Sequence, residues 1–121
     1  MHRSLTAGRW ASVLAVVAAV FAITGAALAA PAHKTATVTV TATEFKFKLS
    51  SSSAKAGSVT FNIVNKGKLS HDFKIGGKKS ALIAPGKSGK LTVTLKAGKY
   101  PYLCTVPGHA AAGMKGTLTV M

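Results

Sequence analysis

The residues best suited to chemistry lie in one short stretch near the C-terminus. Cys104 is the only cysteine of the chain; His109 follows it after four intervening residues, and Met114 follows His109 after four more. Pro107 and Gly108 favour a tight turn between them, so the loop can curl all three side chains around one point. A lone cysteine cannot form an internal disulfide, which leaves a spare thiol, a reactive group or a metal ligand.

This combination of sulfur and nitrogen donors favours one metal. Thiolate, imidazole and a weak thioether are together the ligands of blue-copper centres. Structural zinc prefers a closed set of cysteine and histidine and seldom uses methionine. Cu(I) prefers soft sulfur and Cu(II) accepts imidazole nitrogen, so a mixed site changes little when an electron moves. The sequence therefore predicts a single type 1 copper ion, with one further ligand from elsewhere in the chain.

His71 is the candidate for that further ligand. It lies 33 positions before Cys104, at a loop that enters a strand. Taken singly, each residue has a simpler explanation: Cys104 and Met114 as buried apolar side chains, His71 as a hydrogen-bonded or surface histidine. Taken together and in this order, they favour a metal site. We expect His2 and His33 to be incidental to it.

Seven runs of alternating or β-branched and aromatic residues predict strands. They cover residues 35–41, 45–49, 59–64, 73–75, 91–95, 100–105 and 116–120. Turn residues separate the runs, and no stretch after residue 30 has a sustained helical period. Short strands at this spacing predict an all-β sandwich or barrel of about seven to eight strands, which we assign to a domain over residues 37–121.

The N-terminal segment has a different character. Arg3 and Arg9 precede an uncharged, Ala- and Val-rich run that ends in small residues at positions 27 and 29. This is the layout of a helical signal peptide over residues 1–29, followed by a tether over residues 30–36. An uncleaved membrane anchor is the alternative, because about 20 apolar residues can span a bilayer. We therefore expect a periplasmic or extracellular protein, attached to the membrane only if this segment is not cleaved.

The charge balance constrains partners and reactions. The chain has 16 Lys and Arg residues against two acidic ones, a formal net charge of +14. An acidic partner, an anionic surface or a polyanion would fit, although dispersed lysines also simply keep a protein soluble. Glu44 and Asp72 are the only carboxylate side chains, so paired-carboxylate hydrolysis has little support. Adjacent residues in a strand point to opposite faces, so Ser70, His71 and Asp72 form no triad. We expect no enzyme, and without an aromatic-rich basic face no nucleic-acid binding.

With these motifs the chain resembles the cupredoxin family. The resemblance covers nearly all of the chain after the signal and is strongest over residues 98–116. The spacings around His109 are closer to those of rusticyanin, sulfocyanin and auracyanin than to plant plastocyanin. It implies a Greek-key sandwich, a trigonal plane of His71, Cys104 and His109, an axial Met114, and a backbone N–H near His71 on the sulfur. Many members have an asparagine after the first histidine, where this chain has Asp72.

The sequence thus predicts an exported blue-copper protein that shuttles single electrons. We expect a monomer whose redox partners are acidic proteins docking near His109, where an apolar patch would allow brief contact. One alternative is copper storage or delivery in the cell envelope. A further alternative is a β-domain that binds a polyanion or a membrane surface through its lysines.

Overall fold

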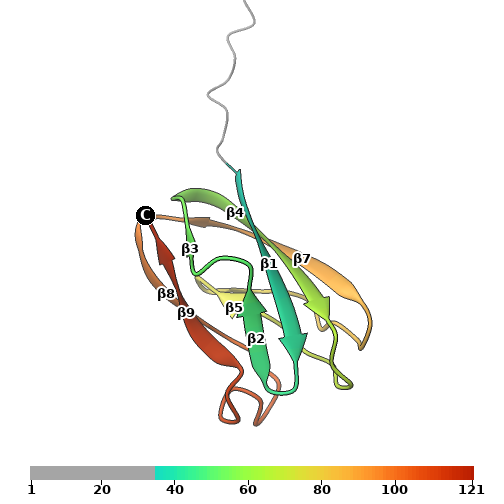
Figure 1. Cartoon of the computed structure of the whole chain (residues 1–121). Helices are drawn as coiled ribbons and strands as arrows, with labels where there is room; N and C mark the ends of the chain where they lie inside the picture. The colour runs from blue at the N-terminus through green and yellow to red at the C-terminus, as the bar shows by residue number, and fades with distance from the viewer. Residues whose placement is uncertain (1–34) are drawn as a thin grey trace, which may run out of the picture.

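The computed structural model describes residues 35–121 (Figure 1). The signal peptide expected over residues 1–29, and the tether before Thr35, lie outside the described residues. Within the described part there is no helix with the length and hydropathy needed to cross a bilayer. The first strand begins at Thr35, as the alternating run over residues 35–41 predicted, and therefore includes the last two residues of the range 30–36 given to the tether.

The described residues form nine strands and no helix, which confirms the predicted all-β sandwich. The strands are β1 (Thr35–Thr43), β2 (Lys46–Leu49), β3 (Ser53–Ala54), β4 (Gly57–Asn65), β5 (Lys74–Ile75), β6 (Lys78–Lys79), β7 (Ser88–Leu95), β8 (Gly98–Leu103) and β9 (Lys115–Val120). One sheet has the order β2-β1-β4-β7 and the other β3-β9-β8-β5-β6. β1 runs parallel to β4 and β3 parallel to β9, whereas the other pairs are antiparallel.

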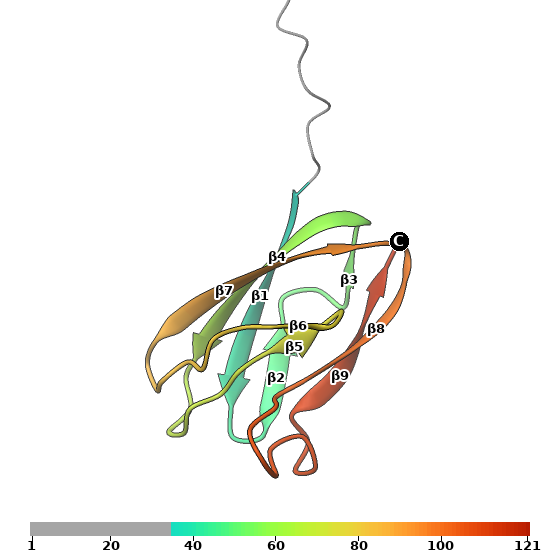
Figure 2. The ribbon, with the colours of Figure 1, turned by 180° about the vertical axis from the view of Figure 1, so that it is seen from behind.

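The alternation seen in the sequence explains this architecture. Val38, Val40 and Ala42 of β1 point inward while the intervening threonines point outward, and β4 repeats the pattern. Because successive strand residues face opposite sides, each sheet has one apolar face, and the two faces enclose the core. Viewed from behind, β8, β5 and β6 cross the near side of the molecule (Figure 2).

An aromatic cluster joins the two sheets beneath one end of the sandwich. Phe73 has no exposed surface and lies 5.1 Å from Phe61, 5.3 Å from Phe47 and 5.4 Å from Tyr102 between ring centroids. Burying side chains of this size stabilises a fold by about 1.5–3 kcal/mol each. The cluster therefore gives the loops at this end a rigid base.

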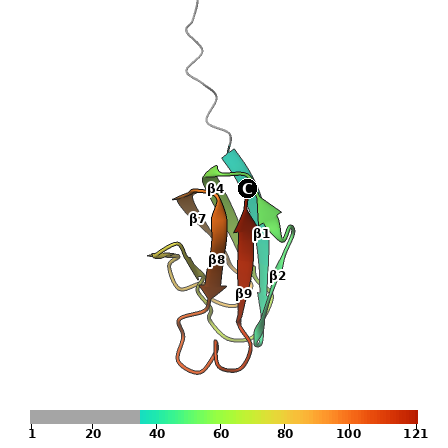
Figure 3. The same ribbon diagram turned by 90° about the vertical axis from the view of Figure 1, so that its left-hand side faces the viewer.

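The predicted metal-binding residues all belong to that end. β1 and β4 finish there and β9 begins there, so the connections β4–β5 and β8–β9 emerge together. Figure 3 shows the β8–β9 loop projecting at this end, with the C-terminus at the other. The sandwich therefore brings together two loops that are more than 30 residues apart in sequence, His71 and Cys104 being 33 apart.

Candidate metal centre

His71 lies on the loop between β4 and β5 and is fully buried. Its backbone N–H donates to Ile83 O at 3.0 Å, and its carbonyl accepts the Ile83 N–H at 2.8 Å. The side-chain amide of Asn65, also fully buried, donates to Leu69 O and to Ile83 O, both at 2.8 Å. These bonds fix the loop from both sides and set the direction from which the His71 ring enters the site.

Cys104, His109 and Met114 share the loop between β8 and β9. The Cys104 N–H donates to Met114 O at 3.0 Å, and the Met114 N–H donates to His109 O at 3.1 Å. Gly108 and Gly113 have φ values of 82° and 124°, which residues with a Cβ rarely adopt. The loop therefore closes on itself with all three of these side chains buried on its inner side.

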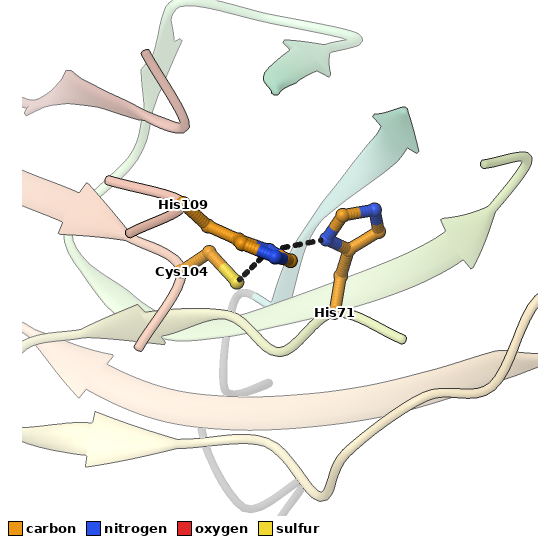
Figure 4. Close-up of side chains that lie close together, drawn as sticks. All are labelled: His71, Cys104 and His109. Carbon is orange, nitrogen blue, oxygen red and sulfur yellow. Dashed lines mark hydrogen bonds between the residues drawn. The ribbon is translucent and has the colours of Figure 1, made fainter. Parts of the chain in front are cut away.

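Three of the predicted ligands meet at one point (Figure 4). The Nδ1 atoms of His71 and His109 lie 3.1 Å apart, and Cys104 Sγ lies 3.7 Å from His109 Nδ1. All three ligand atoms lie within 4.8 Å of one another. Imidazole and thiolate bonds of about 2.0–2.3 Å, in a roughly trigonal arrangement, put ligand atoms about 3.1–3.8 Å apart. The three donors therefore fit one shared metal ion.

Met114 lies in the apolar lining beside these ligands. It is fully buried and forms a small cluster with Ala42 and Cys104, against which Phe47 and Val106 pack. A thioether beside the thiolate is the arrangement that a weak fourth ligand requires. Its role as a ligand stays a prediction.

Asp72 connects the two ligand loops. Its Oδ1 accepts the backbone N–H of Thr105 at 2.6 Å, and its Oδ2 accepts the Thr105 hydroxyl in a short hydrogen bond. Asp72 is 5% exposed, so both bonds are largely shielded from water. The carboxylate that replaces the family's asparagine thus ties the residue after His71 to the residue after Cys104.

Glu44, to which the sequence analysis gave no site role, reaches the centre from the turn between β1 and β2. Its Oε1 accepts the N–H groups of Lys68 at 2.6 Å and Leu69 at 2.8 Å, and lies 3.4 Å from His71 Nε2. The hydrogen bonds, led by that from Leu69, lower the pKa of Glu44 from 4.5 to about 2. The side chain is therefore an anion at neutral pH. The one feature of the sequence that could have indicated a role for Glu44 is the scarcity of acidic residues.

Phe45 covers the other histidine. Its ring centroid lies 5.1 Å from that of His109, and the two planes are inclined at 72°. Phe45 is 39% exposed and His109 only 8%, so the phenyl ring stands between the imidazole and solvent. From the sequence Phe45 is predicted only as a strand residue, because nothing local indicates a contact with a loop 64 positions later.

The thiol of Cys104 is held in its neutral form by its surroundings. Burial raises its pKa above the ordinary 9.0, and the nearby Asp72 carboxylate adds to this, while the backbone N–H groups of Asp72 and Val106 act in the opposite direction. A metal ion must replace this proton, so metal binding releases it. The backbone donor on the sulfur that the family resemblance implies near His71 stays a prediction.

This fold and this ligand group agree with the family assignment. Residues 13–120 match the family described as Cupredoxin-like domain, and the chain belongs to that family. The cofactor is accordingly copper, and His71, Cys104 and His109 form a site of the type 1 kind.

Individual relatives point the same way. Auracyanin-B of Chloroflexus aurantiacus is 55% identical over 42 residues, 34% of this chain and 18% of that protein. The copper-resistant cuproprotein CopI of Pseudomonas aeruginosa is 52% identical over 42 residues, 34% of this chain and 23% of that protein. The chain thus aligns with only about a fifth of the length of each relative.

Solved structures cover more of the chain. The auracyanin B structure aligns with a TM-score of 0.61 at 27% identity, over 74% of this chain and 90% of that one. Rusticyanin from Thiobacillus ferrooxidans aligns with a TM-score of 0.61 at 26% identity, over 73% and 78%. The sequence-based resemblance to these two proteins is confirmed.

Proposed function

We propose that this protein is an exported carrier of single electrons. His71, Cys104 and His109 would hold the copper ion, and Met114 would be a weak fourth ligand. The observation that supports this most is the convergence of one thiol sulfur and two imidazole nitrogens, all buried, within 4.8 Å. When bound, copper supplies the redox chemistry by alternating between Cu(II) and Cu(I).

The protein's contribution is a rigid and dry ligand set. Cys104 and His71 are 1% and 0% exposed, so water has no access to the sulfur or the inner imidazole. The hydrogen bonds of Asn65 and Asp72 hold both loops in place whichever charge the site carries. A site that does not rearrange between two charge states exchanges electrons quickly, which suits a carrier and requires no substrate pocket.

The surface around His109 has the character of a brief docking site. Phe45 lies against His109, Leu69 is two residues from His71, and Leu82 adjoins Ile83, the backbone partner of His71. These three are 39%, 46% and 64% exposed, and they are three of the four exposed large apolar residues in the described chain. An apolar patch of this kind supports close contact with a redox partner without tight binding.

Lysines surround the same end of the sandwich. Exposed lysines stand at the start of β2, in the β4–β5 loop and at the start of β9: Lys46, Lys66, Lys68 and Lys115. Positive charge around an apolar patch would raise the encounter rate with an acidic partner. We therefore propose an acidic redox protein as the partner and the His109 end as its docking site.

Copper storage or delivery is the second candidate. The similarity to the copper-resistant cuproprotein CopI favours it. The burial of all three donors argues against it, because a delivery site must release its ion readily. The chain also has few further thioether or imidazole groups for handing copper on, with three Met and four His residues in all.

Absorption and voltammetry of the copper-loaded protein test the proposal. We expect Cu(II) to produce an intense blue band and reversible one-electron cycling in the wild type. Cys104→Ser should remove the colour, because the band depends on the copper–thiolate bond. A colourless protein that binds and releases Cu(I) freely would instead support copper delivery.

The role of Met114 requires its own variant. We expect Met114→Leu to keep the blue band and raise the reduction potential, since a weak axial donor tunes the potential more than it holds the ion. Leucine has a similar volume, so the apolar cluster with Ala42 should be retained. A Met114→Leu protein that cannot take up copper would contradict this role.

A further inference from the structure

The Glu44 carboxylate is not one of the proposed copper ligands, yet it lies next to His71. One of its oxygens, Oε1, accepts two backbone N–H groups and faces His71 Nε2 at 3.4 Å. His71 Nε2 is fully buried and has no hydrogen-bond partner among the described residues, and the Glu44 oxygen at 3.4 Å is its ion-pair contact. The opposite ring nitrogen, Nδ1, faces His109 and the shared ligand centre. The two nitrogens of His71 are therefore in two distinct environments.

We propose that Glu44 is a positioning residue for copper: it accepts the Nε2–H of His71 and thereby directs the lone pair of Nδ1 toward Cys104 and His109. In a neutral imidazole one nitrogen carries the proton and the other the lone pair, so an acceptor at Nε2 selects the tautomer that can bind metal through Nδ1. This inference rests on the proposed function, because it requires His71 to be a copper ligand.

The loop that carries His71 is built around this carboxylate. A Cβ added to Gly67 would lie 2.5 Å from Glu44 Oε1 and 2.8 Å from Oε2. Lys68 and Leu69, the next two residues, supply the donated N–H groups. Gly67 thus leaves the space that the carboxylate occupies. Glu44 and Asn65 thus hold the same segment of the loop, since Asn65 accepts the Gly67 N–H and donates to Leu69 O.

An anionic acceptor also changes the ligand itself. A carboxylate at Nε2 makes Nδ1 a stronger electron donor, as in other metal sites where an acid supports a histidine ligand. A stronger nitrogen donor favours Cu(II) over Cu(I), because Cu(I) prefers soft sulfur. Glu44 should therefore lower the reduction potential and slow the loss of Cu(II). The 29% exposure of its side chain moderates both effects.

Glu44→Gln tests this in the full copper-loaded protein. Glutamine keeps an oxygen for the two backbone donors but removes the charge. Losses of support for a metal-bound histidine cost about 10–100-fold in affinity, and the exposure of Glu44 places it near the lower figure. We expect Cu(II) binding to weaken about tenfold relative to Cu(I), which raises the potential by about 59 mV. NMR of the reduced protein should also show faster solvent exchange of the His71 Nε2–H.

Two further variants make the result specific. Gly67→Ala should displace the carboxylate without deleting it and shift the potential in the same direction. Lys66→Gln removes one charge from the same loop but leaves the contacts of Glu44 with the backbone N–H groups and with His71 intact. It therefore measures how far a change of charge alone shifts the reduction potential. The positioning role would be overturned if Glu44→Gln and Lys66→Gln shifted the reduction potential by equal amounts in opposite directions and Glu44→Gln left the exchange of the His71 Nε2–H unchanged. A wild type that is not blue would refute the proposed function as well; a blue wild type with an unmoved Glu44→Gln refutes this inference alone.

Discussion

At the scale of single residues, both acidic side chains lie beside the loops that carry the copper ligands. The chain has 16 Lys and Arg residues but only Glu44 and Asp72 as acids. Glu44 contacts His71, and Asp72 bonds to Thr105, the neighbour of Cys104. Carboxylates form stronger hydrogen bonds with the N–H groups of a loop than neutral acceptors do. Both acids are thus used to hold the loops that carry copper ligands.

A residue-scale prediction concerns Tyr102. Its ring packs against Phe73 and Phe47, and burial raises its pKa above the ordinary value of 10.0. Above pH 10 the unfolded chain loses the phenol proton before the native state does, so the unfolding free energy falls as pH rises. This contribution is complete below the unfolded pKa and is lost as pH rises through the native pKa. Tyr102→Phe removes it.

Urea unfolding of wild type and Tyr102→Phe, from about pH 9 to about pH 12, measures the difference. We expect the unfolding free energy of the wild type to fall relative to that of Tyr102→Phe as pH rises. Tyr100→Phe leaves Tyr102 as the only tyrosine, so its ultraviolet titration gives the native pKa directly. A Tyr102 that titrates at its ordinary value would contradict the prediction.

At the scale of elements, the sequence was informative wherever a strand is long enough to have a period. Over residues 35–41, 59–64 and 91–95 the alternation predicted strands that β1, β4 and β7 confirm. The two-residue strands β3 and β6 were not predicted, because two residues carry no period and their pairing depends on β9 and β5. β3 includes Ser53, which lies in none of the predicted strand runs.

Some residues of the site could likewise be predicted from the sequence and others could not. His71, Cys104 and His109 could be predicted because their residue types are rare in combination and the Pro-Gly loop groups two of them. Glu44 and Phe45 could not, since their contacts join the β1–β2 turn to loops that are distant in sequence. Contacts of this kind depend on how two sheets stack, which periodicity does not record.

An element-scale prediction follows from the bridge between the ligand loops. Asp72→Ala removes the acceptor of the Thr105 N–H and hydroxyl, and bonds to charged groups contribute about 1.5–3 kcal/mol. We expect the unfolding free energy in urea to fall by about 3 kcal/mol. Asp72→Asn can still accept from the N–H, and its amide can donate to the hydroxyl, so its loss should be below about 1 kcal/mol. Equal losses in both variants would show that charge, and not the bridge, stabilises the loops.

At the scale of the whole molecule, both ends of the sandwich have exposed lysines, but only one end also has the copper ligands and an exposed aromatic residue. The end with Lys66 and Lys115 also has the copper ligands and the exposed Phe45, whereas the end with Lys96 and Lys99 has neither. All four lysines are exposed. Net charge alone would attract an acidic partner to either end. Under the proposed docking at the His109 end, only charges near that end should affect the rate of electron transfer.

Two matched double variants separate these possibilities. Lys66→Glu with Lys115→Glu, and Lys96→Glu with Lys99→Glu, change the net charge equally at opposite ends. We expect the first pair to slow electron exchange with an acidic redox protein by about tenfold or more at low salt and to flatten its ionic-strength dependence. The second pair should have a much smaller effect. Stopped-flow rates measured across a salt series provide the comparison. Equal slowing by both pairs would mean that the partner responds to total charge and that the His109 end has no special role in docking.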